Sequence, residues 1–188
     1  MWFTLTFKND VKIYQKLVQL HEEFVHDWKA VSSDPDFITQ LMFQSIPTIF
    51  SKHSVAKGGN VLGLDKETEN VVMLLYNIAV KTPELEILAR KKLFASGETM
   101  KKYAASLDGL VSWTYLNYAD GTQVCSWTVY STPSTLTAVQ DPLGSYGHDN
   151  VAKIRAAAKK YDPKQVFQTR VSGGFKISKV KDERKTEL

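Results

Sequence analysis

A small set of polar side chains in this sequence could take part in proton transfer. Tyr118 and Asp120 follow an apolar and aromatic run that begins at Val111, and His53 lies in an earlier segment. A phenol, a carboxylate and an imidazole can each act as an acid or a base when correctly placed. The sequence contains no GxSxG elbow, no Walker loop and no HExxH pair. These three residues are therefore candidates for a pocket that works by positioning its substrate.

The other histidines and the glycines give weaker signals. His21 and His26 are five residues apart, off a common helical face, and His53 and His148 have no ligand-spaced partner, so we expect no metal site. The run 58–63 (GGNVLG) resembles a phosphate-binding loop only superficially, because its third position is Asn60. We expect these glycines to form a turn with positive φ.

The composition is that of a globular protein, with 43% hydrophobic and 23% charged residues in a chain of 188. The net charge is +4, but the basic residues lie among acidic ones, so no nucleic-acid partner is expected. No apolar run is long enough for a membrane span or a signal peptide, and as written the chain is expected to be cytoplasmic. Cys125 is the only cysteine, which excludes an intrachain disulfide framework.

Hydrophobic periodicity predicts the elements of the first half. Residues 2–7 alternate like a strand, and Asp10 can cap a helix that runs through Trp28. The core stripe of this helix is expected to contain Val11, Tyr14, Val18, Val25 and Trp28, with Leu17 and Phe24 beside them. Residues 37–45 and 48–55 are expected to be strands interrupted by Pro47, and 70–80 a further strand.

The second half of the chain is also predicted to contain both helices and strands. Thr82 and Pro83 predict the start of a helix toward Leu107, which could break near Gly97. Residues 111–118 read as a strand, 148–160 as a helix, and 166–177 as a short segment with a glycine turn. The order predicts an α+β protein with an antiparallel β-sheet covered on one side by helices, and a C-terminal helical return segment. We expect one unit over residues 1–176 and a charged tail over 177–188.

Several motifs follow one another along the second half of the chain. They are residues 114–120 (TYLNYAD), 141–147 (DPLGSYG), Asn150, Ile154, 160–163 (KYDP) and 166–167 (VF). The first resembles the Y-x-N-Y-x-D element of the berberine bridge enzyme-like branch of the vanillyl-alcohol-oxidase flavoprotein superfamily, and the others resemble the closing signature of that family in order and spacing. Residues 57–65 and 173–176 (GGFK) are similar to the fungal members. The resemblance therefore spans the chain from Trp2 to Lys176.

The resemblance implies a substrate domain and a role for some residues. Tyr118 would take a proton from the substrate as hydride leaves for the flavin, and Asn117, Tyr146, Gly147 and Asn150 would lie near the flavin or its domain interface. An ordinary tyrosine has a pKa of ~10, so this role needs a charge or dipole that stabilises the phenolate. Without flavin, Tyr118 would be a hydrogen-bonded core or pocket tyrosine, Asn150 would support a helix start, and Gly147 would make the preceding turn.

Two features depart from the family pattern. The FAD-binding half of the family would precede Trp2 and is not present in this sequence, so we expect FAD, the family cofactor, not to be bound by this chain alone. Residues 124–140 separate two motifs that run nearly together in similar fungal proteins. This segment is either an inserted loop or a translated, retained intron, and the codons at its boundaries would distinguish the two.

Three functions remain open at this stage. The chain could be part of a flavin oxidase that acts on a small, largely apolar natural product when a partner supplies FAD. It could be a cofactor-independent cyclase or isomerase that uses Tyr118, Asp120 and His53. It could also be a non-catalytic interaction module. The apolar face that met a missing FAD domain would need cover, so we expect a homodimer or a separate FAD-domain partner.

Overall fold

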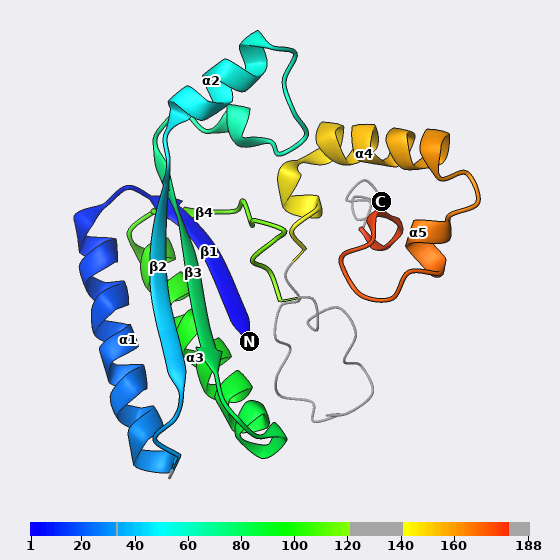
Figure 1. The fold of residues 1–188 in the computed structure, drawn as a ribbon. Helices are drawn as coiled ribbons and strands as arrows, with labels where there is room; N and C mark the ends of the chain where they lie inside the picture. Colours follow the sequence, from blue (N-terminus) through cyan, green and yellow to red (C-terminus); the bar gives the residue numbers. More distant parts are fainter. Residues whose placement is uncertain (33, 121–140, 181–188) are drawn as a thin grey trace, which may run out of the picture.

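The computed structural model describes residues 1–32, 34–120 and 141–180, and residues 124–140 therefore lie outside the described part (Figure 1). Its strands are β1 (Trp2–Lys8), β2 (Ile38–Ile46), β3 (Val71–Ala79) and β4 (Leu110–Val111). Its α-helices are α1 (Val11–Val31), α2 (Thr48–Ala56), α3 (Pro83–Ser106), α4 (His148–Tyr161) and α5 (Val166–Thr169). Three short 3-10 turns complete the described elements: η1 (Leu64–Lys66), η3 (Gly144–Tyr146) and η4 (Ile177–Lys179).

The four strands form one antiparallel sheet in the order β2-β3-β1-β4. In this register Trp2 pairs with Asn77, which pairs with Gln40 on β2, while Lys8 pairs with Val71 at the other end. The predicted α+β class is confirmed, because helices and an antiparallel sheet share one core.

One face of the sheet is covered by α1 and α3. Alternate residues of β1 and β3 point toward these helices and form a buried cluster that includes Phe3, Phe7 and Tyr76. The helices contribute Ile13, Leu17, Leu20, Phe24 and Trp28 from α1 and Ala89, Leu93, Met100 and Ala104 from α3. This layer places both long helices behind the sheet and leaves its second face for other contacts (Figure 1).

The second face is covered by described residues from the end at Val71 inward. Val71 and Met73 pack there against residues that follow β3 in the chain, listed as Val111, Trp113, Leu143, Tyr146, Val151 and Ile177. Arg155 on α4 donates a hydrogen bond to the Val180 carbonyl at 2.7 Å. The C-terminal return segment therefore packs on the face opposite α1 and α3, and this packing extends at least to Val180.

The predicted phase of the α1 stripe was wrong in part. Val11 and Val18 are exposed, and the buried positions are instead Ile13, Leu17, Leu20, Phe24 and Trp28. These five follow a four-, three-, four- and four-residue spacing, so they form one continuous stripe along the helix. The helix is rotated so that larger apolar side chains are buried and the smaller valines face solvent, which removes more apolar area from water.

The strand predicted over residues 48–55 is the helix α2. Pro47 ends β2, and β3 begins at Val71, the partner of Ile46, so a longer β2 would have no strand to pair with on that side. The break considered near Gly97 does not occur, because α3 runs without interruption from Pro83 to Ser106. Tertiary contacts thus override the β-propensity of residues 48–55 and the low helix propensity of glycine.

The strand predicted over residues 111–118 is mostly irregular. Only Leu110 and Val111 pair with β1. Farther along, the backbone donors of Thr114 and Leu116 are bound by side chains, Ser145 Oγ at 3.0 Å and Tyr146 Oη at 3.3 Å. Because η3 satisfies these groups, the segment does not need to continue the sheet ladder.

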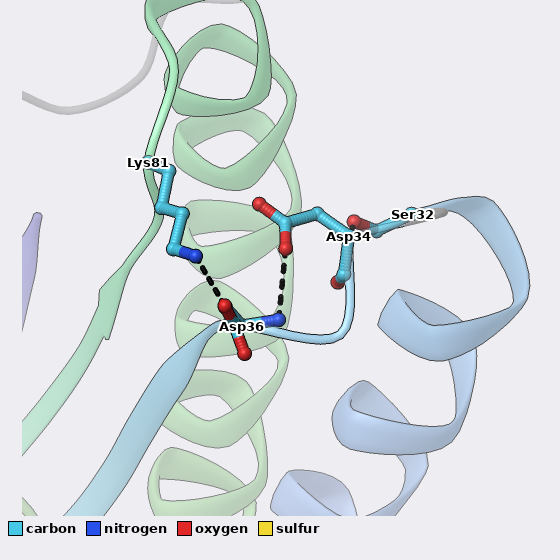
Figure 2. A network of polar contacts seen from close by, with 4 residues as sticks. All are labelled: Ser32, Asp34, Asp36 and Lys81. Carbon is cyan, nitrogen blue, oxygen red and sulfur yellow. Dashed lines mark hydrogen bonds and ion pairs between the residues drawn. The ribbon is translucent and has the colours of Figure 1, made fainter.

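A polar network ties the α1–β2 connection to the end of β3 (Figure 2). Asp34 accepts a hydrogen bond from the Asp36 backbone N–H at 2.8 Å, and Ser32 Oγ donates to the Asp34 carbonyl at 3.3 Å. The Asp36 carboxylate forms an ion pair with Lys81. Both partners of this pair are exposed, so it contributes at most about 1 kcal/mol to stability.

None of the helices in the described part of the chain combines the length and the apolar character that a bilayer span requires.

Candidate functional site

Five aromatic side chains form a continuous row beside β1, which we call the aromatic row: Trp2, Tyr118, Tyr115, Trp113 and Tyr146. Tyr118 packs edge-on against Trp2 with ring centroids 5.8 Å apart and against Tyr115 at 5.1 Å. Trp113 stacks between Tyr115 at 5.7 Å and Tyr146 at 6.2 Å. Each such contact adds about 0.5–1.5 kcal/mol beyond area burial, so the row fixes the position of the Tyr118 ring.

Tyr118 stands on a single turn at the exposed end of this row. The backbone N–H groups of Tyr118 and Ala119 both donate to the Tyr115 carbonyl at 3.1 Å. Asn117 Nδ2 donates to Tyr115 Oη at 2.9 Å, so the tyrosine and asparagine of the recognised motif are held by the same neighbour. Asn117 is exposed and Tyr118 is half-buried, which leaves both accessible from outside the chain.

Asp120, at the end of this segment, forms an ion pair with a residue of α3. Its carboxylate lies 2.7 Å from Arg90 Nη1 on α3, and the Asp120 side chain is only 7% exposed. Arg90 also lies 3.6 Å from Glu86 one turn earlier in the same helix. A carboxylate engaged in this way positions the turn that carries Tyr118, and nothing in the sequence singled out Arg90 as its partner.

The sheet face next to Tyr118 is open. Pairing places Trp2, Asn77 and Gln40 side by side on the face opposite α1 and α3, with Met42 and Ile38 farther along β2. Trp2 is 44% exposed, Met42 38% and Ile38 64%, and Asn77 Nδ2 donates to Gln40 Oε1 at 3.1 Å. We call these five residues the open strip. It offers a largely apolar surface with one amide pair, and Tyr118 lies at its edge through Trp2.

The residues predicted to face a flavin divide into two groups. Asn117 lies beside Tyr118 in the exposed turn, as described above. Tyr146 and Asn150 are buried, and Asn150 Nδ2 donates to the Tyr146 carbonyl at 3.0 Å. Burial raises the pKa of Tyr146, because its phenolate would lose contact with water, and the hydrogen bond from the Leu116 backbone opposes this only in part. Tyr146 therefore stays a neutral packing group.

Gly147 and His53 lie away from the Tyr118 turn. Gly147 has a φ of +90° and precedes the first residue of α4, so it makes the turn before that helix. His53 is exposed on α2, which begins just beyond the end of β2 where Ile46 pairs with Val71. Trp2 and Tyr118 lie at the opposite end of the sheet, roughly 20 Å away along β1 at ~3.3 Å per residue. The structure does not bring His53 together with Tyr118.

A cavity of about 460 Å³ lies between α2, the turn after it, and α4. Its apolar lining comes from Ile46, Phe50, Val55, Leu62 and Leu64, and its polar lining includes Asn60, Asp65, Asn150 and Lys153. None of these residues belongs to the aromatic row, although Trp113 Nε1 donates to the Leu62 carbonyl at 2.9 Å. Sequence reasoning recognised the glycine turn but not the cavity, because its walls come from segments far apart in the chain.

The described residues hold no metal-ligand cluster, and their glycine turn differs from a phosphate-binding loop. Within residues 1–32, 34–120 and 141–180, no three His, Cys, Asp or Glu side chains gather as metal ligands. Gly58 and Gly59 have φ values of +100° and +79° and follow the C-terminus of α2. A phosphate-binding loop precedes a helix N-terminus instead, because the free N–H groups there attract the anion. The predicted turn with positive φ is confirmed at these two glycines.

Comparisons with known proteins agree with the flavoprotein resemblance. The FAD-dependent monooxygenase drtC of Aspergillus calidoustus is 37% identical over 183 residues, which make up 96% of this chain and 31% of the relative. The FAD-dependent monooxygenase sdcF of Emericella nidulans is 30% identical over 176 residues, 94% of this chain and 33% of the relative. An uncharacterized FAD-linked oxidoreductase of Arthroderma benhamiae is 24% identical over 167 residues, 84% of this chain and 30% of the relative.

The chain is thus related to a part of fungal FAD-dependent oxidoreductases. It spans about a third of the length of the curated relatives it matches. No protein-family model matches the sequence. No solved structure matches it significantly.

Proposed function

We propose that this chain supplies the substrate-facing sheet of an FAD-linked oxidoreductase of the berberine bridge enzyme-like kind. The observation that supports this most is the position of Tyr118, which packs on Trp2 at the edge of an open, largely apolar sheet face. The relatives that align with almost the whole chain are FAD-dependent. In this proposal the open strip binds a small, mostly apolar natural product between the sheet and the flavin.

In this proposal, different residues of the chain would bind the substrate and accept its proton. The open strip would bury the apolar body of the substrate, with the Asn77–Gln40 amide pair as hydrogen-bonding groups. Tyr118 would accept a proton from the substrate as a hydride leaves the adjacent carbon, and the flavin, when bound, would supply the hydride acceptor. Because Trp2 and Tyr115 hold the Tyr118 ring at 5.8 and 5.1 Å, its hydroxyl would be preorganised for that transfer.

In this proposal the described residues would contact only part of a flavin. Asn117 and Tyr118 are accessible and could face the ring system, and Asn117 offers an amide for hydrogen bonding. Tyr146 and Asn150 are instead engaged with the chain itself. The glycine turn follows a helix rather than preceding one, so it does not provide a phosphate cradle. We therefore propose that the remaining contacts to FAD come from sequence that corresponds to the other two thirds of the relatives.

A chimaera tests this proposal. The aligned third of the Aspergillus calidoustus relative would be replaced by this chain, and FAD content and reduction of the flavin by that enzyme's substrate would be measured. We expect the chimaera to retain FAD, and Tyr118→Phe to slow flavin reduction about 100-fold or more without loss of FAD, as for a general base.

The matched control is Tyr103→Phe, a half-buried tyrosine on α3 outside the aromatic row. It should leave both FAD content and reduction rate unchanged. Equal reduction rates for the parent chimaera and Tyr118→Phe would show that Tyr118 is not the base. Separately, the chain alone should come off gel filtration colourless after incubation with FAD, and a retained flavin spectrum would contradict the proposed division of the FAD contacts.

A further inference from the structure

The 460 Å³ cavity beside α2 has the dimensions of a small-molecule site. Ligand pockets in proteins span about 300–1,000 Å³ and combine an apolar lining with a few polar groups. Here α2 and the turn after it form one wall, and the first turns of α4 form another. The open strip and the aromatic row contribute no residue to this lining, so the cavity is separate from the Tyr118 site.

The helix α2 leaves apolar surface uncovered at this cavity. None of its nine residues is buried, and Phe50 and Val55, which line the cavity, are 62% and 55% exposed. A helix of this length is marginal without tertiary packing. A bound apolar molecule would remove this surface from water.

The segment 62–64 at the end of the turn is held more firmly than α2. Trp113 Nε1 binds the Leu62 carbonyl at 2.9 Å, and Gly63 lies so close to η3 that an added Cβ would come within 2.3 Å of the Tyr146 carbonyl oxygen. Leu62 and Leu64 also pack against the buried cluster on that side of the sheet. The cavity therefore has one preformed wall and one wall, α2, that can gain contacts.

Hydrogen bonds within the lining leave an acceptor on one buried residue, Asn150, without a donor in the described part of the chain. Ser51 Oγ donates to the Thr48 carbonyl at 2.9 Å, and Asn60 donates to Ser54 Oγ at 2.7 Å while accepting from the Leu62 N–H at 2.8 Å. Asn150 is only 6% exposed, and no described residue donates to its amide oxygen.

The hydrogen bond to Tyr146 also identifies the Asn150 side-chain atom that has no donor among the described residues. The partner of its amide is the Tyr146 carbonyl, an acceptor, so the bonded atom must be nitrogen and the remaining atom oxygen. The buried side-chain atoms without a partner in the described chain are Thr6 Oγ1 and Trp28 Nε1, so the Asn150 oxygen remains accessible, and Asn150 lines the cavity. The site thus presents an acceptor for an O–H or N–H group.

The charges of the lining favour a neutral ligand. Asp65 and Lys153 both border the cavity, and their formal charges cancel. We propose that this cavity is a second ligand site, one that binds a neutral, largely apolar aromatic molecule and receives its hydroxyl or N–H donor at the Asn150 amide oxygen. This inference is independent of the role proposed for Tyr118.

The test uses 2-naphthol, a neutral aromatic probe with one hydroxyl donor, and 2-methoxynaphthalene, which differs by loss of that donor. Isothermal titration calorimetry on the intact chain should show one site for 2-naphthol and about five-fold weaker binding of the methoxy probe, the effect of one hydrogen bond of ~1 kcal/mol. This comparison leaves the protein unchanged, so it does not depend on an Asn150 variant that folds.

Two matched variants locate the site. Phe50→Ala should weaken binding of 2-naphthol about ten-fold by loss of apolar contact. Phe167→Ala on α5 removes a phenylalanine of nearly equal exposure, 63% against 62%, outside the lining, and should leave binding unchanged. Absence of saturable binding, equal affinity for both probes, or equal loss in both variants would each overturn the proposal.

A final titration separates this site from the proposed flavin function. FAD added to the preformed 2-naphthol complex should not displace the probe. Displacement by FAD would assign the cavity to the cofactor and overturn the inference of a separate ligand, whatever the outcome for Tyr118 in the chimaera.

Discussion

The substitution Gly97→Ala should destabilise the protein, although Gly97 lies inside a long helix. In an ordinary helix interior, alanine is about 1 kcal/mol more favourable than glycine. Here an added Cβ would lie 2.7 Å from three atoms of the Phe3 ring. Normal carbon contacts are ~3.5–4.0 Å, so either the ring or α3 must move by close to ~1 Å.

Phe3 cannot move freely, because its side chain is 1% exposed and packs edge-on against Phe94 at 5.7 Å. Overpacking of this kind costs about 1–3 kcal/mol. After the gain in helix propensity is subtracted, we expect Gly97→Ala to lower the free energy of unfolding by up to about 2 kcal/mol. Urea denaturation followed by circular dichroism measures this directly, with an accompanying fall of a few degrees in the melting temperature.

A double-mutant cycle tests the stated cause. Phe3→Val removes the ring atoms that the new methyl group would meet, so Gly97→Ala in that background should become stabilising by up to ~1 kcal/mol. The reasoning is refuted if Gly97→Ala stabilises the chain that retains Phe3. It is also refuted if the effect of Gly97→Ala has the same sign and size in both backgrounds.

Three other predictions follow from local contacts. Asp120→Asn should cost about 1–3 kcal/mol in urea unfolding, less than a fully buried pair, because Arg90 is 32% exposed. Gly63→Ala should lower the melting temperature more than Gly58→Ala does. Both glycines have positive φ, but of these two only Gly63 would bring an added Cβ against a backbone atom, at 2.3 Å. Burial lowers the pKa of His21. As the pH falls through ~6.5, the unfolded chain therefore takes up more protons at this residue than the folded chain does, and the protein loses stability. His21→Gln should show a smaller loss of unfolding free energy than the parent chain between about pH 7.5 and 5.5.

Local signals were sufficient to predict the long elements. Asp10 accepts a hydrogen bond from the Lys12 N–H at 2.7 Å, and Thr82 accepts one from the Leu85 N–H at 3.3 Å, so both predicted helix caps are confirmed. The alternation in β1 and the apolar run of β3 likewise correspond to the two central strands. These features depend on neighbours within a few residues, which a sequence displays directly.

Elements whose conformation depends on distant partners could not be predicted in this way. Residues 48–55 have strand-like composition, and they are helical because β3 offers no partner beyond Val71. Residues 111–118 contain β-branched and aromatic types, but Ser145 and Tyr146 bind the backbone that a strand neighbour would otherwise bind. In both segments the deciding group lies more than fifteen residues away in the chain, beyond any periodic pattern.

The surroundings of the candidate site residues also depend on distant parts of the chain, and they could not be predicted from the sequence. The motif resemblance singled out Tyr118 and Asp120 together, but it could not show that the two side chains have different surroundings. The structure pairs Asp120 with Arg90 on the helix layer and packs Tyr118 against Trp2 at the open sheet face. The Asp120 carboxylate is held in an ion pair with a partly buried guanidinium, and leaving that contact would give up the interaction. Asp120 is therefore better understood as the residue that anchors the turn, and in the proposed function Tyr118 would be the residue that the turn presents to a substrate.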